Sequence, residues 1–555
     1  MPPARAALSA ALAAAIAAAS AAGPAPPTAV WPQPRQAASG SAAVPVAPGP
    51  DFFSLGGHGE SPLLEAAFER YAALTFPHAG GATPVSRAGA VVGLVLSVWV
   101  LGEAHPQVST DESYNLSVPS AGGVAVASSR TVFGALRALE TFSQLVRFDF
   151  DRGAYVVDGA PWVIQDRPRF PHRGLMIDSA RHFLSLPSIR QIIDTLPYAK
   201  LNVLHWHMVD QQSFPFQSKS SPKLWEGSYS AVERYTQADV ESVVEYARLR
   251  GVRVMVEFDV PGHAASWCIG YPEICPAADC QMPLNVASEA TFNLIEGLIS
   301  EVAGTGSSKS HDASGLFPDS FVHLGGDEVN TSCWTKTPSV ASWLQERNLT
   351  ADEGYAYFAK RVASMVIQRG HRPVQWSEVY DHFKASLPKE TIVHIWKGVT
   401  NVTEVVANGY DVLINVATGD KPWYLDYLNI KWDAVYRNDP CHGIPTDELC
   451  ARVLGGHGEM WGETVDGSDL QSTVWPRLAA IAEKLWSGRS QTEDVAEVLP
   501  RIRAFRCLLL QRGVAAAPVD NAQARAAPAG PGSCFEQGAR APGSARPVGE
   551  RAILL

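Results

Sequence analysis

The sequence predicts an α/β fold, in which a (β/α)8 TIM barrel follows a small α/β domain. Two observations predict the barrel. From residue 167 onward, short apolar runs alternate with helical patterns, and eight such repeats span roughly the length of a (β/α)8 barrel. The alternative is a doubly wound open sheet, which usually carries a glycine-rich phosphate loop after its first strand. This sequence has no such loop there.

The barrel is expected to cover residues 166–515. Its strands are predicted at 174–178, 203–207, 252–257, 321–324, 373–376, 392–396, 411–415 and 453–456. Apolar residues recurring at helical spacing predict helices between these strands, at 188–200, 238–250, 289–303 and 353–369.

A smaller α/β domain is expected at 51–165, with strands at 91–101 and 113–118 and a helix at 131–146. One face of that helix carries Phe133, Leu136, Leu139, Phe142 and Val146. No cluster of titratable or ligand-type residues stands out in the sequence of this domain. We therefore expect it to have a structural role.

Both ends of the chain have biased compositions. Residues 1–22 hold one early cation, Arg5, then an apolar run and small residues, which is the form of a secretory signal peptide. Residues 23–50 are rich in Pro, Ala and Gly and are predicted to be a linker. Residues 516–555 have a similar bias and are predicted to be a tail held by one disulfide.

The composition excludes several classes of partner. With 46% hydrophobic and 18% charged residues, the chain has ample material for a core, and its net charge of −11 argues against nucleic acid or an anionic membrane surface. Past the signal peptide, no apolar stretch is long enough to cross a bilayer. Four N-x-S/T triplets fit the secretory route, and three are predicted glycan acceptors: Asn115, Asn348 and Asn401. The fourth, Asn330, lies too near an acidic pair to be expected to carry a glycan.

Eight cysteines also fit an oxidising compartment, and they lack zinc-type spacing with histidines. We expect Cys507 to pair with Cys534, and Cys441 with Cys450, because each pair closes a modest loop. Cys333 is expected to pair with one member of a cluster that the sequence does not resolve: Cys268, Cys275 and Cys280.

The acidic pair Asp327-Glu328 follows the short apolar strand at 321–324 and two glycines, Gly325 and Gly326. Neighbouring side chains of a regular strand point to opposite faces, but a Gly-Gly break allows both acids to share one site. Repulsion between them would then hold one acid protonated, which suits a general acid. Taken alone, the pair fits a solvated loop equally well.

The ends of the other predicted strands favour a site. The active sites of (β/α)8 barrels lie at the C-terminal ends of the strands, and here those ends carry acids, aromatics and one histidine: Asp210, Asp259, His263, Trp376, Trp396, Trp423, Tyr424, Asp426, Trp461 and Glu463. Aromatic rings stack on the C–H faces of a sugar, and carboxylates bind its hydroxyls. A metal site would need histidines and acids at ligand spacing, and the histidines are scattered along the chain. We expect a sugar site without cofactor or metal.

These motifs resemble the family 20 glycoside hydrolases, the β-N-acetylhexosaminidases. The resemblance rests on ordered stretches such as His-Leu-Gly-Gly-Asp-Glu at 323–328 and Trp-Tyr-Leu at 423–425, and also on 171–178, 200–207, 257–263, 461–463, 475–477 and 482–487. It covers about residues 113–534 and is closest to the eukaryotic lysosomal or secreted branch.

The resemblance implies an exo-acting, retaining mechanism in which the 2-acetamido group of the substrate is the nucleophile. Glu328 would be the general acid and base, Asp327 would bind the acetamido N–H, and Tyr424 would bind its carbonyl. By the same resemblance, the acetamido pocket and sugar ring would be walled by Trp376, Trp396 and Trp461. Arg173 and Glu463 would bind the outer hydroxyls, and Asp210 and His263 would orient the acid. Asp426 should bind the hydroxyls of a neutral sugar because it is an acid that follows the Trp-Tyr-Leu triplet. Structural roles are expected for four further residues: His205, His207, Asp178 and Arg181.

The sequence departs from the family at two places. Relatives that accept acidic sugars place Asn and Arg after the Trp-Tyr-Leu triplet, where this chain has Asp426 and Tyr427, so an acidic neighbouring group should be repelled. Residues 456–459 also differ, which leaves the local loop shape open.

Two other functions are alternatives to an exo-acting hydrolase. A catalytically silent sugar-binding protein could keep the tryptophans but lose an acid, whereas this chain keeps Asp327, Glu328 and Tyr424. A chitin-chain-degrading enzyme would need an extended aromatic cleft. The partner expected is a glycan ending in N-acetylhexosamine. Relatives are commonly dimers, so we expect a homodimer. The expected location is the lysosome, a vacuole or the extracellular space.

Overall fold

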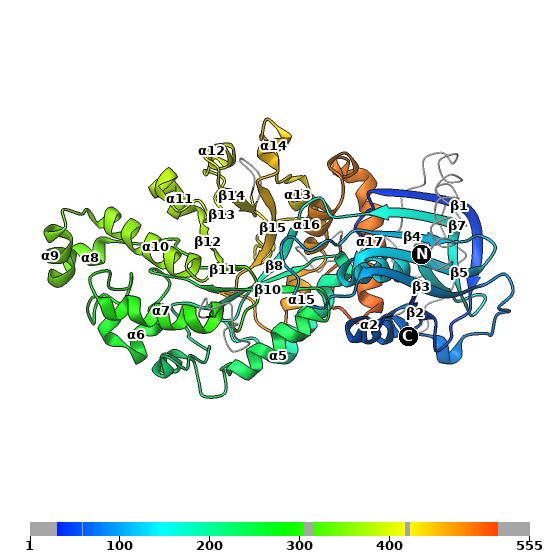
Figure 1. Ribbon diagram of the computed structural model, residues 1–555, viewed down its shortest axis with the longest axis horizontal. Coiled ribbons are helices and arrows are strands. Elements are labelled where there is room, and N and C mark those ends of the chain that lie inside the picture. The colour runs from blue at the N-terminus through cyan, green and yellow to red at the C-terminus, as the bar shows by residue number, and fades with distance from the viewer. Residues whose placement is uncertain (1–29, 58, 305–314, 417–421, 520–555) are drawn as a thin grey trace, which may run out of the picture.

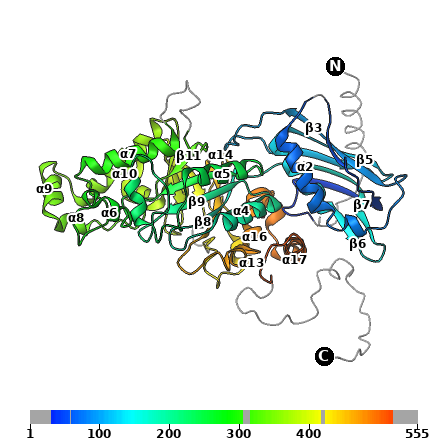
Figure 2. The same cartoon turned by 90° about the horizontal axis from the view of Figure 1, so that it is seen from below.

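A computed structural model describes residues 30–57, 59–304, 315–416 and 422–519. Figure 1 shows two units side by side, an N-terminal sheet domain in blue and cyan and a larger β/α unit that runs from green to orange. Figure 2 shows helix α2 (Pro62–Thr75) lying across one face of the N-terminal sheet. Of the described helices, none is long and apolar enough to span a membrane.

The predicted barrel is confirmed. Eight parallel strands close in the order β10-β11-β12-β13-β14-β15-β8-β9. Their bounds are β8 His172–Asp178, β9 Val203–Val209, β10 Arg253–Phe258, β11 Phe321–His323, β12 Arg372–Trp376, β13 Ile392–Ile395, β14 Asp411–Ile414 and β15 Val453–Met460. Residues 456–459, whose shape the sequence left open, lie inside strand β15.

Helices follow the strands around the barrel. The four predicted helices are present as α4 Leu186–Thr195, α5 Gln237–Arg248, α7 Glu289–Ala303 and α10 Ala351–Ile367. Thr236 and Thr350 form capping boxes that start α5 and α10. The remaining helices of this unit are α6 Trp267–Gly270, α8 Ser332–Lys336, α9 Pro338–Glu346, α11 Ser377–Phe383, α12 Val402–Ala407, α13 Trp432–Arg437, α14 Asp447–Cys450, α15 Leu470–Val474, α16 Arg477–Trp486 and α17 Val495–Gln511.

The barrel interior is layered. Near the N-terminal ends of the strands, alternate residues form a small apolar layer: Val203, Met255, Phe321, Val374, Ile392 and Leu413. Above it, inward positions are polar, and His205, His323, His394 and Glu459 are all fully buried. Gly174 completes this layer because a Cβ there would lie 2.2 Å from the ring of His457. The apolar layer fills the N-terminal end of the barrel. The polar layer lies under Trp376, which its members His394 and His323 contact.

The N-terminal domain contains a seven-stranded sheet in the order β1-β3-β5-β4-β7-β6, with β2 paired to β3. Its elements are β1 Gln36–Val46, β2 Phe53–Leu55, β3 Val91–Val100, β4 Tyr114–Val118, β5 Gly123–Thr131, β6 Val146–Asp149, β7 Ala154–Asp166 and helix α3 Val132–Leu145. Helix α3 packs its predicted apolar face into the core of this domain.

The predicted linker at 23–50 is wrong over its second half. Residues 36–46 form strand β1, which pairs antiparallel with β7 over almost its whole length, and Val44 and Val46 are buried. Small residues such as Ala, Ser and Gly have low strand propensity, so pairing with a neighbour decides this strand rather than its own composition. The signal peptide at 1–22 and the tail beyond residue 519 lie outside the described residues.

Candidate active site

The acidic pair lies in a sharp turn after β11. Gly325 and Gly326 have φ angles of +63° and +95°, and a Cβ on Gly325 would lie 1.9 Å from Oδ1 of Asp259. Glycine is therefore required there. The turn brings Asp327 and Glu328 to the same ring nitrogen of His263, with Nε2 lying 3.8 Å from Asp327 Oδ2 and 3.5 Å from Glu328 Oε2. The two acids share one site, as the Gly-Gly break suggested.

Asp327 is buried, with 6% of its surface exposed. Its Oδ1 atom has no hydrogen-bond partner among the described residues. Burial raises the pKa of Asp327, and burial together with the Asp327 charge raises the pKa of neighbouring Asp259 further. We infer that Asp259 holds the proton and donates a hydrogen bond to Asp327. One oxygen of Asp327 is then held while the other is free to accept a donor from a ligand.

The sequence predicted that repulsion between the two acids keeps Glu328 protonated, but the structure lowers the pKa of Glu328 instead. Its side chain is 59% exposed, and the hydrogen bond with His263 lowers its pKa. Burial alone would lower the pKa of His263, but hydrogen bonds to Asp210 and Glu328 and the charge of Asp327 raise it. The proton of this pair therefore rests on His263, beside Glu328. The acid whose pKa is raised is Asp327, because it is the buried one.

His263 is held by a chain of buried acids and histidines. Its Nδ1 lies 3.2 Å from Oδ1 of Asp210, whose Oδ2 lies 2.9 Å from His207 Nε2. His207 Nδ1 in turn lies 2.7 Å from Glu257 Oε2. Burial opposes ionisation of Asp210, but the hydrogen bonds from His207 and His263 lower its pKa. The structure thus brings Asp210 and His263 to Glu328, as predicted from the sequence, and His207 contacts the other oxygen of Asp210.

Three tryptophans wall this end of the barrel. Trp376 is fully buried, stacks on His394 with ring centroids 4.3 Å apart and donates from Nε1 to Glu257 Oε1 at 2.8 Å. Trp461 lies 6.0 Å from Trp376. Trp396 is partly buried and lies 6.2 Å from the ring of Tyr424. These rings form an aromatic enclosure next to the acids.

Tyr424 and Asp426 come from a short segment that pairs with strand β15. Leu425 N donates to Glu459 O at 2.7 Å, and Glu459 N donates to Trp423 O at 2.8 Å, so the segment has a fixed register. Tyr424 is 7% exposed. Burial raises the pKa of Asp426 to about 7, and its Oδ1 has no hydrogen-bond partner among the described residues. Asp426 is therefore a half-buried acid with one uncommitted oxygen.

Arg173 is not in this site, which corrects the sequence prediction. It lies at the N-terminal end of β8, fully buried. Its Nη2 pairs with Glu112 Oε2 at 2.6 Å, its Nε donates to Lys200 O, and its Nη1 donates to Phe170 O. The side chain joins the barrel to the N-terminal domain and faces away from the C-terminal strand ends.

Arg181, and not Arg173, lies beside the site residues Glu463 and Trp461. The sequence predicted a structural role for Arg181. It follows the C-terminal end of β8 and pairs with Asp178 at 2.9 Å and with Asp210 at 2.8 Å. Its Nη1 also lies 3.7 Å from Glu463, whose side chain is 53% exposed, and its guanidinium lies over the Trp461 ring at 5.1 Å. The arginine links the buried acids to the open end of the site.

Glu378 and Lys397 are further site residues that sequence reasoning missed. Trp396 donates from Nε1 to Glu378 Oε2 at 2.7 Å, and Lys397 Nζ lies 2.6 Å from Glu378 Oε1. Burial and the nearby Asp327 raise the pKa of Glu378. Glu378 lies two residues and Lys397 one residue after a tryptophan already assigned to the site. A search that extended two residues past the C-terminal end of each predicted strand would have found both residues.

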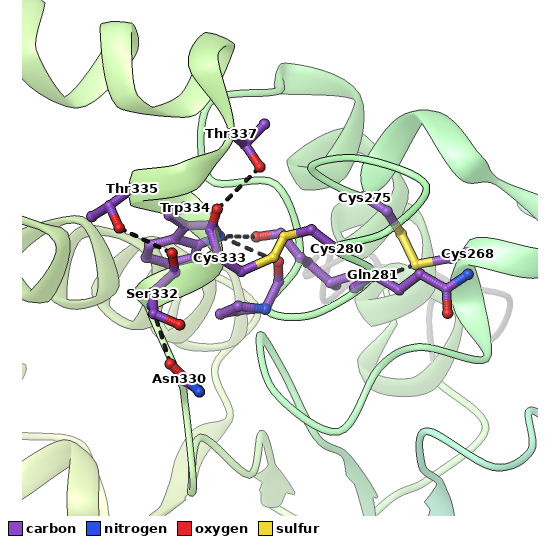
Figure 3. Close-up of a disulfide and its surroundings, with 12 residues drawn as sticks. Cys268, Cys275, Cys280, Gln281, Asn330, Ser332, Cys333, Trp334, Thr335 and Thr337 are labelled. Carbon is purple, nitrogen blue, oxygen red and sulfur yellow. Dashed lines mark hydrogen bonds between the residues drawn. A yellow bond between two sulfur atoms is a disulfide. The ribbon is translucent and has the colours of Figure 1, made fainter.

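Disulfides brace the loops beside the acids (Figure 3). Cys280 pairs with Cys333, with Cα atoms 5.9 Å apart, which ties the loop after β10 to the segment that follows Glu328. The predicted Cys441–Cys450 disulfide is confirmed, and a Cys268–Cys275 disulfide was not anticipated. The predicted partner of Cys507, Cys534, lies outside the described residues.

Barrel closure does gather the histidines that look scattered in the sequence. Metal-ligand-type atoms of His205, His394, His457 and Glu459 lie within 4.8 Å of one another, all fully buried. Hydrogen-bonding groups reach this cluster at its edges. Arg253 donates to Nδ1 of His172, whose other nitrogen faces His457 Nε2. Nδ1 of His323 lies near both Gly325 N and Glu257 Oε1, and its other nitrogen faces His394 Nδ1.

Two histidines of the cluster face Glu459. His394 Nε2 lies 3.2 Å and His457 Nδ1 lies 3.6 Å from Glu459 Oε1, as close contacts rather than well-formed hydrogen bonds. Burial lowers the pKa of His394 to about 3, so it is neutral. Trp376 stacks on His394, so we interpret the cluster as a buried polar support beneath that ring.

Comparisons with known proteins agree with this geometry. Residues 170–489 match the glycosyl hydrolase family 20 catalytic domain, and residues 30–145 match a domain described as beta-acetyl hexosaminidase like. Beta-hexosaminidase 1 of Arabidopsis thaliana is 42% identical over 92% of this chain and 95% of its own length. The human beta-hexosaminidase subunit beta is 36% identical over 82% of each chain.

A solved structure gives the same result. The chitobiase of Flavobacterium johnsoniae superposes with a TM-score of 0.74 at 28% identity, over 88% of this chain and 73% of that one. The family match covers more than half of the chain and includes all the strands of the barrel. The chain therefore belongs to glycosyl hydrolase family 20 and is a glycoside hydrolase.

Proposed function

We propose that Asp327, Glu328 and Tyr424 carry the reaction of this β-N-acetylhexosaminidase, which removes terminal β-linked N-acetylglucosamine or N-acetylgalactosamine. The observation that supports this best is the contrast between the two adjacent acids. Asp327 is buried with one oxygen uncommitted, whereas Glu328 is largely exposed and shares a proton with His263. Two acids held in unlike environments suit unlike roles.

In the first step the acetamido oxygen of the substrate attacks the anomeric carbon while the bond to the leaving oxygen breaks. Asp327 accepts a hydrogen bond from the acetamido N–H and stabilises the positive charge that develops there. The Tyr424 hydroxyl binds the acetamido oxygen and orients it for attack. Glu328, supplied with a proton through His263, protonates the leaving oxygen.

In the second step Glu328 is anionic and takes a proton from a water molecule. That water adds to the anomeric carbon and opens the oxazolinium ring, which restores the acetamide with retained configuration. Trp376, Trp396 and Trp461 enclose the acetamide and the sugar ring. Asp426, Glu463 and Arg181 bind the outer hydroxyls, so the chain removes one terminal sugar at a time.

A fluorinated substrate series tests which group is the nucleophile. Aryl β-glucosaminides with N-acetyl, N-fluoroacetyl, N-difluoroacetyl and N-trifluoroacetyl groups differ in the electron density of the amide oxygen. If that oxygen attacks, kcat/KM falls steeply with each fluorine, and the first sugar product seen by NMR is the β anomer. A rate that does not depend on fluorine would assign the nucleophile to the protein and overturn the proposal.

The location and assembly are proposed on other grounds. Disulfides persist in oxidising compartments, and the three described disulfides support a secretory route to the lysosome, a vacuole or the extracellular space. Asn348 and Asn401 are exposed and accessible to a glycan, whereas Asn115 is half-buried in β4. We also propose a homodimer. A mass of one chain in light scattering of the purified protein would exclude it.

A further inference from the structure

A second concave region lies between the N-terminal sheet and the segment after α16. It encloses about 1040 Å3 and has no lining residue in common with the active site. Its floor is a row of polar side chains at paired positions of neighbouring strands, formed by Ser128, Asn115, Gln165 and Gln36. Residues paired across strands present their side chains on one face of a sheet. Residues 488–491 form the opposite wall.

Four arginines line this groove. Arg35, Arg130 and Arg167 come from the ends of sheet strands, and Arg489 comes from the opposite wall. Among the described residues, none of these guanidinium groups has an ion pair or a side-chain hydrogen bond. Burial and repulsion from Arg167 and Arg169 lower the pKa of Arg35 by more than the charge of Asp166 raises it, which is the response expected where positive charge is in excess.

The acids that line the groove compensate the charge of these arginines only in part. Asp111 accepts hydrogen bonds from the backbone N and Oγ of Ser113, at 2.8 and 2.6 Å. Asp166 is buried and pairs with Lys200 at 2.9 Å. Asp111 keeps its charge, so Asp111 and Glu493 face four guanidinium groups. On a chain of net charge −11, this concentration of cations stands out.

An aromatic side chain completes the lining. Trp99 precedes the end of β3, 72% exposed, and its neighbours in the pairing of β3 with β5 place it beside Arg130. An exposed indole can stack on the C–H face of a sugar ring. Guanidinium forks bind sulfate and carboxylate groups through paired hydrogen bonds. Amide and hydroxyl side chains on the floor suit sugar hydroxyls.

We propose that this groove is a second binding site, which holds an anionic oligosaccharide bearing sulfate or carboxylate groups. Its volume lies at the upper end of the range for ligand pockets. The site is non-catalytic, because it contains no paired acids at a reacting position. It would hold the enzyme on a charged glycan while the barrel removes terminal sugars elsewhere, and it does not depend on the roles proposed for Asp327 and Glu328.

Binding can be measured with a chondroitin sulfate tetrasaccharide that has a uronic acid at its non-reducing end, and with its desulfated counterpart. The protein carries Ser117→Ala, which removes the glycan acceptor at Asn115 but keeps that side chain. A thiazoline inhibitor saturates the active site. We expect calorimetric binding of the sulfated chain that weakens with salt, at least about tenfold tighter than binding of the desulfated chain.

Variants locate the site. Arg130→Gln with Arg489→Gln should weaken binding about tenfold or more, and Trp99→Ala should weaken it as well. The matched control is Arg152→Gln with Arg437→Gln, two exposed arginines outside the groove, which should leave binding unchanged. All variants should keep full activity on an aryl β-N-acetylglucosaminide. Equal affinity of the groove variant and the control, equal affinity for both tetrasaccharides, or no binding at all would each overturn the proposal.

Discussion

Arg173, at the start of strand β8, and Arg181, just beyond its end, lie in opposite kinds of environment. At its N-terminal end, Arg173 is fully buried against Glu112, whose other oxygen pairs with Arg137 at 2.7 Å. Beyond its C-terminal end, Arg181 starts a chain of charges that leads outward to Glu463. One charge network closes on itself and the other opens to solvent. Buried charges that satisfy one another hold the fold, whereas a network that ends on exposed acids can meet a substrate.

The pKa shifts at the two ends support the same distinction. At the domain junction, burial opposes ionisation of Glu112, but Arg173 and Arg137 lower its pKa, so it stays charged and paired. In the active site, neighbouring acids shift in opposite directions. The pKa values of Asp327 and Asp259 are raised and that of Glu328 is lowered. Opposed shifts in one small site indicate acid-base chemistry.

The largest effect should come from Glu328→Gln. This change removes the proton donor of the open network but keeps the size of the side chain. We expect turnover of an aryl β-N-acetylglucosaminide with a poor leaving group to fall about 10²–10⁴-fold. The melting temperature should be unchanged, because the Glu328 side chain is largely exposed.

Two comparisons make that result specific. A substrate with a good leaving group needs less protonation, so its first step should be affected much less. Glu346→Gln, at an exposed acid of α9, serves as the neutral control. If both substrates lost activity equally, Glu328 would not be the acid.

His263→Asn should change the pH profile of kcat/KM. In the wild type the Glu328–His263 pair keeps one proton until the pH passes the raised pKa of His263. Without the imidazole, the proton is lost at the pKa of Glu328 itself, which belongs to a carboxyl group. The alkaline limb of the profile should therefore move to lower pH. An unmoved limb would show that His263 does not supply the proton.

Asp426 should make selectivity against anionic sugars depend on pH. Its pKa is raised to about 7, so it is mostly neutral below pH 7 and anionic above. Repulsion of a 6-sulfated substrate should then appear as the pH rises through about 7. We expect the rate ratio of neutral to sulfated aryl substrate to increase about tenfold. Asp426→Asn should remove this pH dependence, and a ratio that rises equally in that variant would place the effect elsewhere.

The sequence predicted the barrel well because its strands are buried on both faces. Runs such as 203–207 and 392–396 are apolar or aromatic on the outward face, and that pattern identifies strands of a parallel barrel. Strand β1 escaped because its residues are small and its pairing partner lies more than a hundred residues later. Register with a distant strand cannot be read from local composition.

Site residues were predicted where the end of a strand positions them. They were missed where the surrounding side chains determine which residue reaches the site. Trp376, Tyr424 and Asp327 follow from strand ends, whereas Arg173 and Arg181 differ only in which end of β8 each one lies beside. Charge assignment failed for a similar reason. The sequence places Asp327 beside Glu328, but the burial of Asp327, the exposure of Glu328 and the contact of Glu328 with His263 set which pKa rises.

The most direct test neutralises one carboxylate at each end of the barrel. Glu112→Gln removes the charge paired with Arg173, and Glu463→Gln removes the charge near Arg181. We expect Glu112→Gln to lower the free energy of unfolding by about 3–5 kcal/mol, because it leaves buried arginines unpaired, while kcat/KM per folded molecule is unchanged. Glu463→Gln should leave unfolding within about 0.5 kcal/mol and lower kcat/KM by about 10–100-fold. The opposite pattern, or two variants that behave alike, would contradict the division between a structural end and a catalytic end.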